Sequence, residues 1–375
     1  MRLIFTSELT KPVSLDGGGG VNKIVYYLVE GLVRKGHEVI LLASGDSHTS
    51  AKLIPVIPRH LDSNTHLPGK VRDLLKVKTV TYLQNVIANS QDIIANHLGW
   101  RLLLFCDQIM NNPIVTTTHN NPLSTYAHEI YRLPFPNRYF ISISNNQKSI
   151  FEKAGVSIYR NIYNAIPIDK FTYQETPQND YLFYLGRISK GKGLNEILDI
   201  AKKFNKKTII AGDKDDAEQE YYQEIESKIY SDPNITGVGE ISFEERIKLI
   251  SNTYFFLFPV QWEEPFGLVM VESMACGTPV IAFARGSVPE IIKDGETGFI
   301  VNQSDDDIRG DWIIKKTGIE GLCEAVERIY SMPKKQYQEM RYACRKHVEK
   351  YFTVERMIDD YEKVYQDVLD KYKKD

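Results

Sequence analysis

Short apolar runs alternate with helix-like patterns along the first half of the chain. The runs are rich in β-branched residues and read RLIFTS, EVILLAS, DIIANH, PIVTTTH and RYFISIS. Between the first two, apolar residues recur every three to four positions over about residues 21–34, as in an amphipathic helix. Strands that alternate with helices indicate βαβ units, so this half predicts a parallel α/β sheet.

The same alternation begins again at Tyr181. Strand-like runs read YLFYLGR, KTIIAGD, YFFLFPV and PVIAFA, and helical patterns lie between them, for example at 218–230 and after Pro265. The repeated rhythm predicts a second α/β unit of similar size.

Breaks in this rhythm suggest where the domains end. We predict two α/β domains, at 1–165 and 181–353, with the ligand site in the cleft between them. Residues 166–180 carry prolines and mixed charge without periodicity, which predicts a linker. Apolar spacing over 354–375 predicts a last helix that packs back on the first domain.

Composition excludes several classes of protein. The 375 residues carry 46 basic and 49 acidic side chains, and the net charge of -3 offers no global field for holding a polyanion, so we expect no nucleic-acid partner. Four cysteines without C-x-x-C spacing predict buried thiols in the reducing cytoplasm. Met1 leads directly into a strand-like run and no 18 apolar residues follow one another, so we expect neither a signal peptide nor a membrane-spanning helix.

Two glycine-rich stretches could hold a phosphate. Gly17 to Gly20 directly precede the helix pattern of residues 21–34, and a helix N-terminus offers unpaired N–H groups to an anion. A plain surface turn explains these four glycines as well. The spacing is not the G-x-G-x-x-G of a dinucleotide site.

The second stretch, LGRISKGKGLNEI, places Arg187 and Lys192 between a strand and a helix. Gly186 to Lys192 match G-x-x-x-x-G-K, but Gly193 stands where a P-loop needs a Ser or Thr for magnesium. We therefore interpret the stretch as two separate cations on a diphosphate. A solvated basic loop is the alternative.

The stretch EEPFGLVMVE contains two carboxylates, Glu264 and Glu272. Pro265 is tolerated at a helix start, so we expect Glu264 just outside a helix that runs to about Cys276, with Glu272 inside it. Eight helical residues would separate the two carboxylates by about 12 Å. A glycoside hydrolase pair is only about 5 to 9.5 Å apart.

This spacing suits a nucleotide sugar laid along the helix start. The sugar would lie at Glu264, the ribose at Glu272, and the phosphates near the N–H groups of Gly267 and Leu268.

Together these motifs resemble the retaining glycosyltransferases of family 4, which have the α/β GT-B fold of two facing Rossmann-like domains. The resemblance spans nearly the whole chain and includes GLVRKGHEV, VTTTHN, ISISNNQKSIFEKAGV, GRISKGKG and EEPFGLVMVESMACGTPVIAF. The Glu, seven residues, Glu pattern is its most specific part. The stretch LVRKGHEVILLASGDSHTSAKL is more weakly similar to a bacterial subgroup that includes pterin glucosyltransferases.

The resemblance implies a role for each matching residue. His119 would lie over the donor sugar and stabilise its developing positive charge, and Gly18 and Gly19 would bring their loop onto the diphosphate. The implied catalytic residues are His119, Glu264, Arg187 and Lys192. The implied donor-binding residues are Gly18, Gly19, Arg187, Lys192, Glu264, Phe266, Gly267, Leu268 and Glu272.

The expected reaction moves a hexose from a nucleoside diphosphate sugar to a hydroxyl acceptor. Heterolysis leaves new negative charge on the diphosphate, which fixed cations stabilise. No protein nucleophile is evident, and retention is implied by the family. We expect UDP-glucose as donor, with GDP-mannose as the alternative, and no metal or other cofactor. A P-loop-like nucleotide hydrolase and a nucleotide-sugar epimerase are the competing classes, and the acceptor and oligomeric state stay open.

Four further features of the sequence have a structural or a functional interpretation. His37 fits a structural role at a turn, while His97 ends a strand and could meet the acceptor. Asp213 and Asp215 form a D-x-D pattern, which we interpret as a charged loop rather than a metal site. Residues 69–87 predict one basic amphipathic helix, which would make weak peripheral contact with anionic lipid or present a solvated face.

Overall fold

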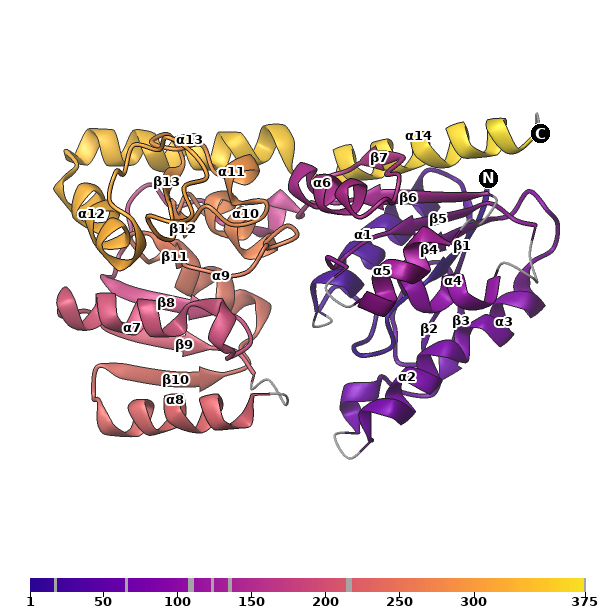
Figure 1. The fold of residues 1–375 in the computed structure, drawn as a ribbon, viewed down its shortest axis with the longest axis horizontal. Coiled ribbons are helices and arrows are strands. Elements are labelled where there is room, and N and C mark those ends of the chain that lie inside the picture. The colour runs from indigo at the N-terminus through magenta and orange to yellow at the C-terminus, as the bar shows by residue number, and fades with distance from the viewer. Residues whose placement is uncertain are drawn as a thin grey trace. The chain divides into compact units, whose positions relative to one another are not determined.

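A computed structural model divides the chain into two units (Figure 1). Unit 1 consists of Met1–Ala165 and Val354–Asp375, and unit 2 of Ile166–Thr353. The structure describes residues 1–16, 19–64, 67–106, 111–122, 125–133, 137–213 and 218–373. In each unit, parallel strands are flanked by helices.

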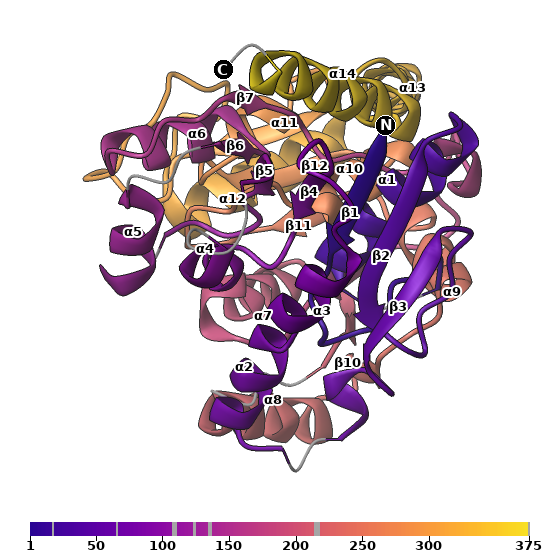
Figure 2. The ribbon, with the colours of Figure 1, turned by 90° about the vertical axis from the view of Figure 1, so that its right-hand side faces the viewer.

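Within the part of unit 1 that the structure describes, seven strands form a parallel sheet in the order β3-β2-β1-β4-β5-β6-β7 (Figure 2). Its strands are β1 (Arg2–Thr6), β2 (Glu38–Ser44), β3 (Lys52–Ile57), β4 (Ile93–Asn96), β5 (Ile114–Thr117), β6 (Arg138–Ser142) and β7 (Arg160–Asn161). The central strands β4 and β5 are buried throughout, as expected for a parallel sheet covered on both faces. The strand order reverses between β1 and β4, and such a switch point is where open α/β sheets bind ligands.

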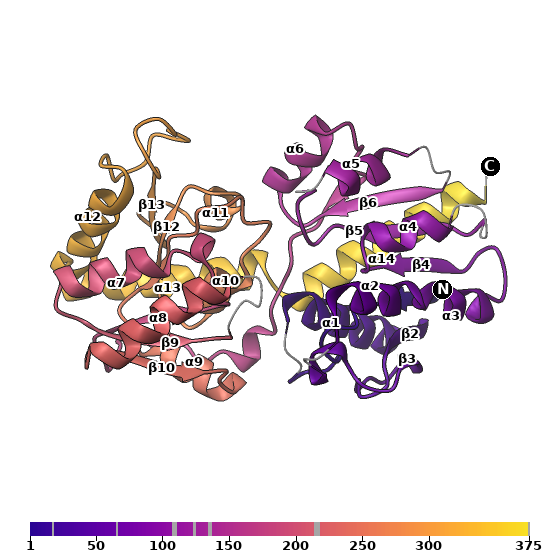
Figure 3. The same cartoon turned by 60° about the horizontal axis from the view of Figure 1, so that its bottom comes forward.

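Seven helices belong to the described part of unit 1. They are α1 (Gly20–Arg34), α2 (Gly69–Val77), α3 (Thr79–Val86), α4 (Trp100–Cys106), α5 (Thr125–Arg132), α6 (Asn145–Lys153) and α14 (Val354–Tyr372). The last helix lies against α1 (Figure 3), and a Cβ at Gly31 would come within 2.1 Å of Ile358 Cδ1. The single helix predicted at 69–87 is wrong, because the chain forms two helices that break at Lys78.

The described residues of unit 2 form six parallel strands in two hydrogen-bonded groups, β10-β9-β8 and β11-β12-β13, and β8 contacts β11. The strands are β8 (Tyr181–Leu185), β9 (Lys207–Ala211), β10 (Ile235–Gly239), β11 (Phe256–Phe258), β12 (Val280–Phe283) and β13 (Gly298–Val301). The helices are α7 (Leu194–Lys203), α8 (Gln219–Ser231), α9 (Phe243–Ser251), α10 (Leu268–Ala275), α11 (Val288–Ile291), α12 (Gly318–Ser331) and α13 (Lys334–Tyr351).

Residues 166–180, predicted as a linker, are part of unit 2. The backbone N–H of Gln174 donates to the carbonyl of Cys276 at 3.1 Å, and Phe171 is buried. The guanidinium of Arg341, fully buried on α13, donates from Nε to the Gln174 carbonyl at 2.7 Å. An aperiodic, proline-bearing segment is therefore held by backbone hydrogen bonds, which leave no periodic signal in the sequence.

Two findings on membrane helices and cysteines concern only the residues that the structure describes. None of their helices is both long and apolar enough to cross a bilayer. Cys276, Cys323 and Cys344 are free, buried thiols.

Candidate functional site

In unit 2, the loops that follow β8 and β11 bring two predicted site residues together. Lys192 Nζ lies 3.2 Å from Glu264 Oε2, an ion pair whose side chains are only 19% and 13% exposed. The indole Nε1 of Trp262 donates to the same carboxylate oxygen at 2.9 Å. Lys192 Nζ also lies 4.1 Å from the centre of the Trp262 ring, so three side chains form one cluster. Sequence reasoning missed Trp262, because no spacing rule marks it.

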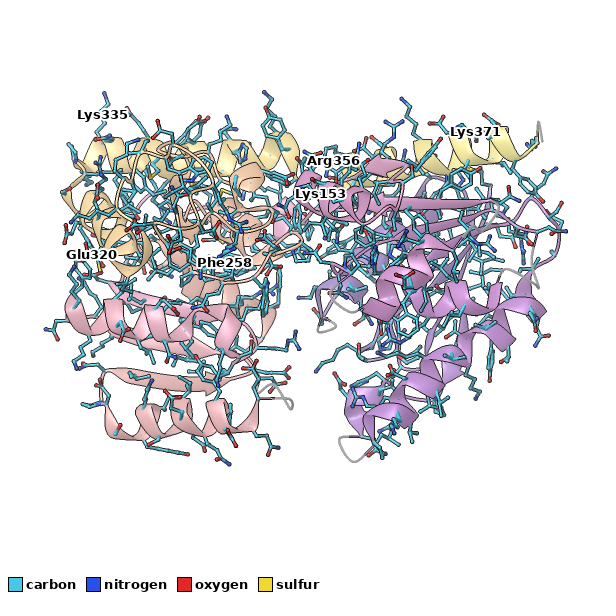
Figure 4. The ribbon with its side chains drawn as sticks, viewed as in Figure 1. Lys153, Phe258, Glu320, Lys335, Arg356 and Lys371 are labelled. Atoms are coloured by element: carbon cyan, nitrogen blue, oxygen red, sulfur yellow. The ribbon has the colours of Figure 1, made fainter. Side chains whose placement is uncertain are left out.

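The aromatic surroundings of Lys192 extend to β11. The ring of Phe258, labelled in Figure 4, has its centre 5.9 Å from Lys192 Nζ. Gly267 follows Glu264 with φ of 78°, and a Cβ there would lie 3.3 Å from Glu264 Cγ and 2.6 Å from Met270 Cε. A glycine at 267 therefore gives the chain its left-handed turn and leaves room for Glu264 at the start of α10.

The start of α10 differs from the prediction. The helix begins at Leu268, three residues after Pro265, because Gly267 in the left-handed conformation occupies its N-cap. The residues between Glu264 and Leu268 are not helical, so the 12 Å separation expected for a continuous helix does not apply. The first N–H groups of α10 still have no i−4 carbonyl acceptor within the helix, as at any helix N-terminus.

Glu272 lies within α10 and is buried, with 5% of its surface exposed. Its Oε1 lies 3.2 Å from Nη2 of Arg246, a residue of α9 whose guanidinium also lies 5.0 Å from the Phe243 ring centre. The carboxylate therefore has a charge partner inside unit 2. Its role toward a ribose stays a prediction. The carboxylate would accept hydrogen bonds from the ribose hydroxyls through lone pairs that Arg246 does not use.

The neighbouring Glu263 anchors the loop that carries Glu264. Its Oε1 lies 3.2 Å from Arg285 Nη1 and 2.7 Å from Arg309 Nη1, and its Oε2 accepts the backbone N–H of Gly286 at 2.8 Å. Asp307 lies against both arginines, and its hydrogen bond to Arg309 lowers the pKa of its carboxyl. The sequence shows a second glutamate directly before Glu264, but no role was predicted for it.

The turn before α7 explains the departure from the P-loop pattern. Gly193 has φ of 76°, and a Cβ there would lie 2.2 Å from the carbonyl oxygen of Pro259. A Ser or Thr at this position would meet both obstacles, so the fold has no place for the magnesium-binding hydroxyl of a P-loop.

Arg187 lies exposed in the loop after β8, one residue before the Ile188 N–H that donates to the Asp213 carbonyl at 2.8 Å.

Asp215, the second aspartate of the D-x-D pattern, lies outside the described residues. Across the described ranges, no three His, Cys, Asp or Glu side chains gather in a way that could hold a metal ion.

Unit 1 has a cavity of about 260 Å³ at the carboxyl ends of β1, β4 and β5, the switch point of its sheet. Its lining includes Glu8, His97, Trp100, Arg101, His119 and Tyr131. The two histidines predicted from the sequence therefore line one cavity.

His97 and His119 form a pair, with His97 Nδ1 2.9 Å from His119 Nε2. The Phe5 ring stacks on His97 at 5.6 Å, and the backbone N–H of His97 donates to the Thr6 carbonyl at 3.1 Å. Burial lowers the pKa of His97 well below its ordinary value, helped by the nearby His119, and lowers the pKa of His119 to about 4. Both imidazoles are therefore neutral at pH 7, and one of the facing nitrogens carries the shared proton.

The two formally charged residues that line the cavity have partners of opposite charge. Glu8 Oε2 lies 3.0 Å from Lys76 Nζ, and Arg101 Nη2 lies 2.9 Å from Asp73 Oδ1 while its guanidinium stacks on Trp100 at 4.7 Å. The basic face predicted at 69–87 for lipid is thus partly neutralised, since Lys76 is paired within unit 1.

The remaining candidates of unit 1 lie at its edges. Gly19, with φ of 85°, is the N-cap of α1, the position that an anion site requires, whereas Gly17 and Gly18 lie outside the described residues. His37 contacts the N-terminal amine at 3.1 Å and Glu362 Oε1 at 2.7 Å, as a structural residue does.

Comparison with known proteins identifies both units. Residues 166–347 match the family model for glycosyl transferases group 1, and residues 18–170 match the model for glycosyltransferase family 4. An uncharacterised 41.2 kDa protein from the cps region of Klebsiella pneumoniae is 26% identical over 215 residues, which are 55% of this chain and 54% of that protein. The chain thus spans about half the length of this relative.

Two solved structures are similar in fold. Sucrose-phosphate synthase from Thermosynechococcus elongatus superimposes with a TM-score of 0.79 at 19% identity, over 99% of this chain and 100% of the other. Anabaena HepE, solved with UDP-glucose, gives 0.74 at 17% identity, over 98% and 100%. The predicted fold and family are confirmed, while the subgroup stays a prediction. The chain belongs to glycosyltransferase family 4 and has the α/β GT-B fold of two Rossmann-like domains.

Proposed function

We propose that the protein is a retaining hexosyltransferase that takes its sugar from a nucleoside diphosphate sugar bound to unit 2. The observation that carries the proposal is the ion pair between Lys192 and Glu264 at the N-terminus of α10. It joins a cation suited to a phosphate with a carboxylate suited to sugar hydroxyls, beside the N–H groups of a helix start.

These groups match the charge that the reaction develops. Cleavage of the sugar–phosphate bond places negative charge on the diphosphate, which Lys192, Arg187 and the first N–H groups of α10 would stabilise. Both donors to Glu264 bind its Oε2, so Oε1 is not committed to either of them. The leaving phosphate oxygen would accept the proton of the attacking hydroxyl on the same face, which gives retention.

The cavity of unit 1 supports a neutral hydroxyl acceptor. Its histidines are neutral at pH 7, and its charged lining residues, Glu8 and Arg101, are already paired. An anionic or cationic acceptor would have to compete with these pairs. His97 and His119 are therefore our candidates for hydrogen bonds to hydroxyl groups.

UDP-glucose is the donor we propose, because HepE of the same fold binds it in a solved structure. GDP-mannose is the alternative, since base recognition through backbone groups leaves little trace in side chains. We further propose that no metal is required, as Lys192, Arg187 and the helix start supply the positive field.

Thermal-shift measurements with UDP, GDP, ADP and their sugars, with and without EDTA, test the donor. A ligand at 100 times its Kd stabilises the protein by roughly 2.7 kcal/mol. We expect a shift with UDP and UDP-glucose that EDTA leaves intact. A shift with GDP alone would refute the proposed donor, and a shift abolished by EDTA would refute the metal-free site.

A further inference from the structure

Trp262 contacts both other members of the cluster in unit 2, Glu264 and Lys192. Its Nε1–H donates to Glu264 Oε2 at 2.9 Å, and the centre of its ring lies 4.1 Å from Lys192 Nζ. The ring also covers Gly191, where a Cβ would come within 2.7 Å of Cε3 of the indole. The backbone N–H of Gln261 donates to the Gly191 carbonyl at 2.9 Å, which fixes the two loops together next to the ring.

These contacts give the indole two separable properties. The ring face attracts the Lys192 ammonium, a cation–π contact that a phenyl ring also offers. The N–H group is a neutral donor to a carboxylate, a charge-assisted bond that only a ring with a donor can make.

The difference matters when a diphosphate arrives. Lys192 is bound to Glu264 in the structure, and a doubly charged phosphate would draw the ammonium away from the carboxylate. Glu264 then loses one of its two donors to Oε2. The Trp262 N–H is the donor that stays, so Glu264 keeps its place while Lys192 changes partners.

We propose that Trp262 is a positioning residue that holds Glu264 in the sugar-binding geometry when Lys192 turns to the phosphates. This inference rests on the proposed function. It assigns the N–H group to the placement of Glu264 and the ring face to the placement of Lys192.

The variant W262F tests the N–H group, because it keeps a ring face and removes the donor. We expect its kcat for UDP release from UDP-glucose to fall about tenfold or more, as for loss of a bond to a charged group. The Kd for UDP should stay within about twofold, since Lys192 keeps its aromatic support. A purely structural role would instead change kcat, UDP affinity and Tm together.

The variant W312F is the matched control. Trp312 also belongs to unit 2 and donates its indole N–H to a side-chain oxygen, Asn302 Oδ1, at 3.2 Å, so the same chemical change is made outside the cluster. We expect parent-like kcat. The variant W262H returns a ring N–H and should recover part of the kcat lost in W262F when assayed at pH 8, where an ordinary imidazole is neutral.

The outcomes separate this inference from the proposed function. If the parent protein released no nucleoside diphosphate from either UDP-glucose or GDP-mannose, the proposed function itself would be refuted. An active parent, an inactive E264Q and a W262F with parent kcat would refute the positioning role alone, as would an equal loss in W312F. If W262F does not fold, W262H decides: parent-like UDP affinity with kcat above that of E264Q supports the role, and kcat as low as that of E264Q overturns it.

Discussion

Glu272 is a buried carboxylate that depends on one charged partner. The variant E272Q leaves the Arg246 guanidinium, whose side chain is 16% exposed, without its counter-charge. We expect a loss of about 3 kcal/mol in the free energy of unfolding, because breaking a buried pair strands a charge. UDP affinity should fall as well, through loss of the proposed ribose contact. Urea unfolding and UDP titration measure the two effects.

The pair Glu324–Arg328 on α12 supplies the control for this prediction. It is an exposed i,i+4 pair at 3.2 Å, so E324Q should cost no more than about 1 kcal/mol. Equal losses in E272Q and E324Q would contradict the importance of the buried pair. Parent-like UDP binding by E272Q would leave Glu272 a structural residue only.

His119 predicts a pH dependence of stability in unit 1. Its pKa of about 4 lies below the ordinary value of about 6.5 because burial disfavours the charged form. Between these values the unfolded chain binds more protons than the folded one, so stability falls as the pH drops from 6.5 toward 4.

The variant H119Q removes this titration. We expect its Tm to fall less than that of the parent between pH 7 and pH 5, when the parent Tm is measured in the same buffers. His347 in unit 2 also has a pKa lowered by burial and stays in both proteins, so its contribution cancels in the comparison. His97 stays as well, and loss of the nearby His119 removes one cause of its lowered pKa, which changes the Tm difference in the same direction. Equal falls in Tm would show that His119 is protonated without cost in the folded state.

Among the elements, strands made of buried apolar runs could be predicted from the sequence. Exposed strands, a strand with a proline and a break between two helices could not. The apolar runs at β1, β2, β4, β5 and β6 appear where the pattern placed them. Strand β10 reads ITGVG and is largely exposed, so it carries no apolar run to detect, and β3 contains a proline, which argues against a strand. The break at Lys78 divides a continuous amphipathic pattern, and such a break has no signal in residue spacing alone.

The turn between β8 and α7 yields a prediction on Gly193. The variant G193S should lose about 1–3 kcal/mol from the positive φ alone and more from the close Pro259 carbonyl. Gly239 has φ of 67° with no atom within 4 Å of its would-be Cβ, so G239S isolates the cost of φ. Thermal unfolding should rank G193S below G239S. A stable G193S that gains magnesium-dependent phosphate release would revive the P-loop interpretation.

The same turn carries Lys192, whose proposed contact is with the leaving diphosphate. K192A should raise the barrier by about 2–4 kcal/mol, comparable to the loss of one oxyanion donor, and should lower kcat more than donor affinity. Lys190 is exposed in the same turn, so K190A is the control and should keep parent kcat. Initial rates at saturating UDP-glucose give the kcat of both variants. Undiminished turnover in K192A would show that Lys192 does not contact the phosphates.

For the whole molecule, local motifs predicted the family and the residues of each unit, but not how those residues pair. Lys192 and Glu264 were both identified, because glycine-flanked loops and the Glu, seven residues, Glu pattern are local signals. Trp262 and the anchoring of Glu263 by Arg285 and Arg309 depend on contacts between distant segments, which one sequence does not display. The pairing of His97 with His119 is of the same kind, since it requires adjacent strands β4 and β5.

The reaction that we propose is transfer of a hexose with retention from a nucleoside diphosphate sugar. The most direct measurement is NMR of UDP-glucose incubated with the protein, with water as the acceptor and E264Q as the control. We expect UDP together with α-glucose as the first anomer formed, and little of either with E264Q. Magnesium-dependent release of inorganic phosphate from ATP or GTP would instead indicate a nucleotide hydrolase. An isomeric UDP-sugar would indicate an epimerase, and β-glucose appearing first would contradict retention.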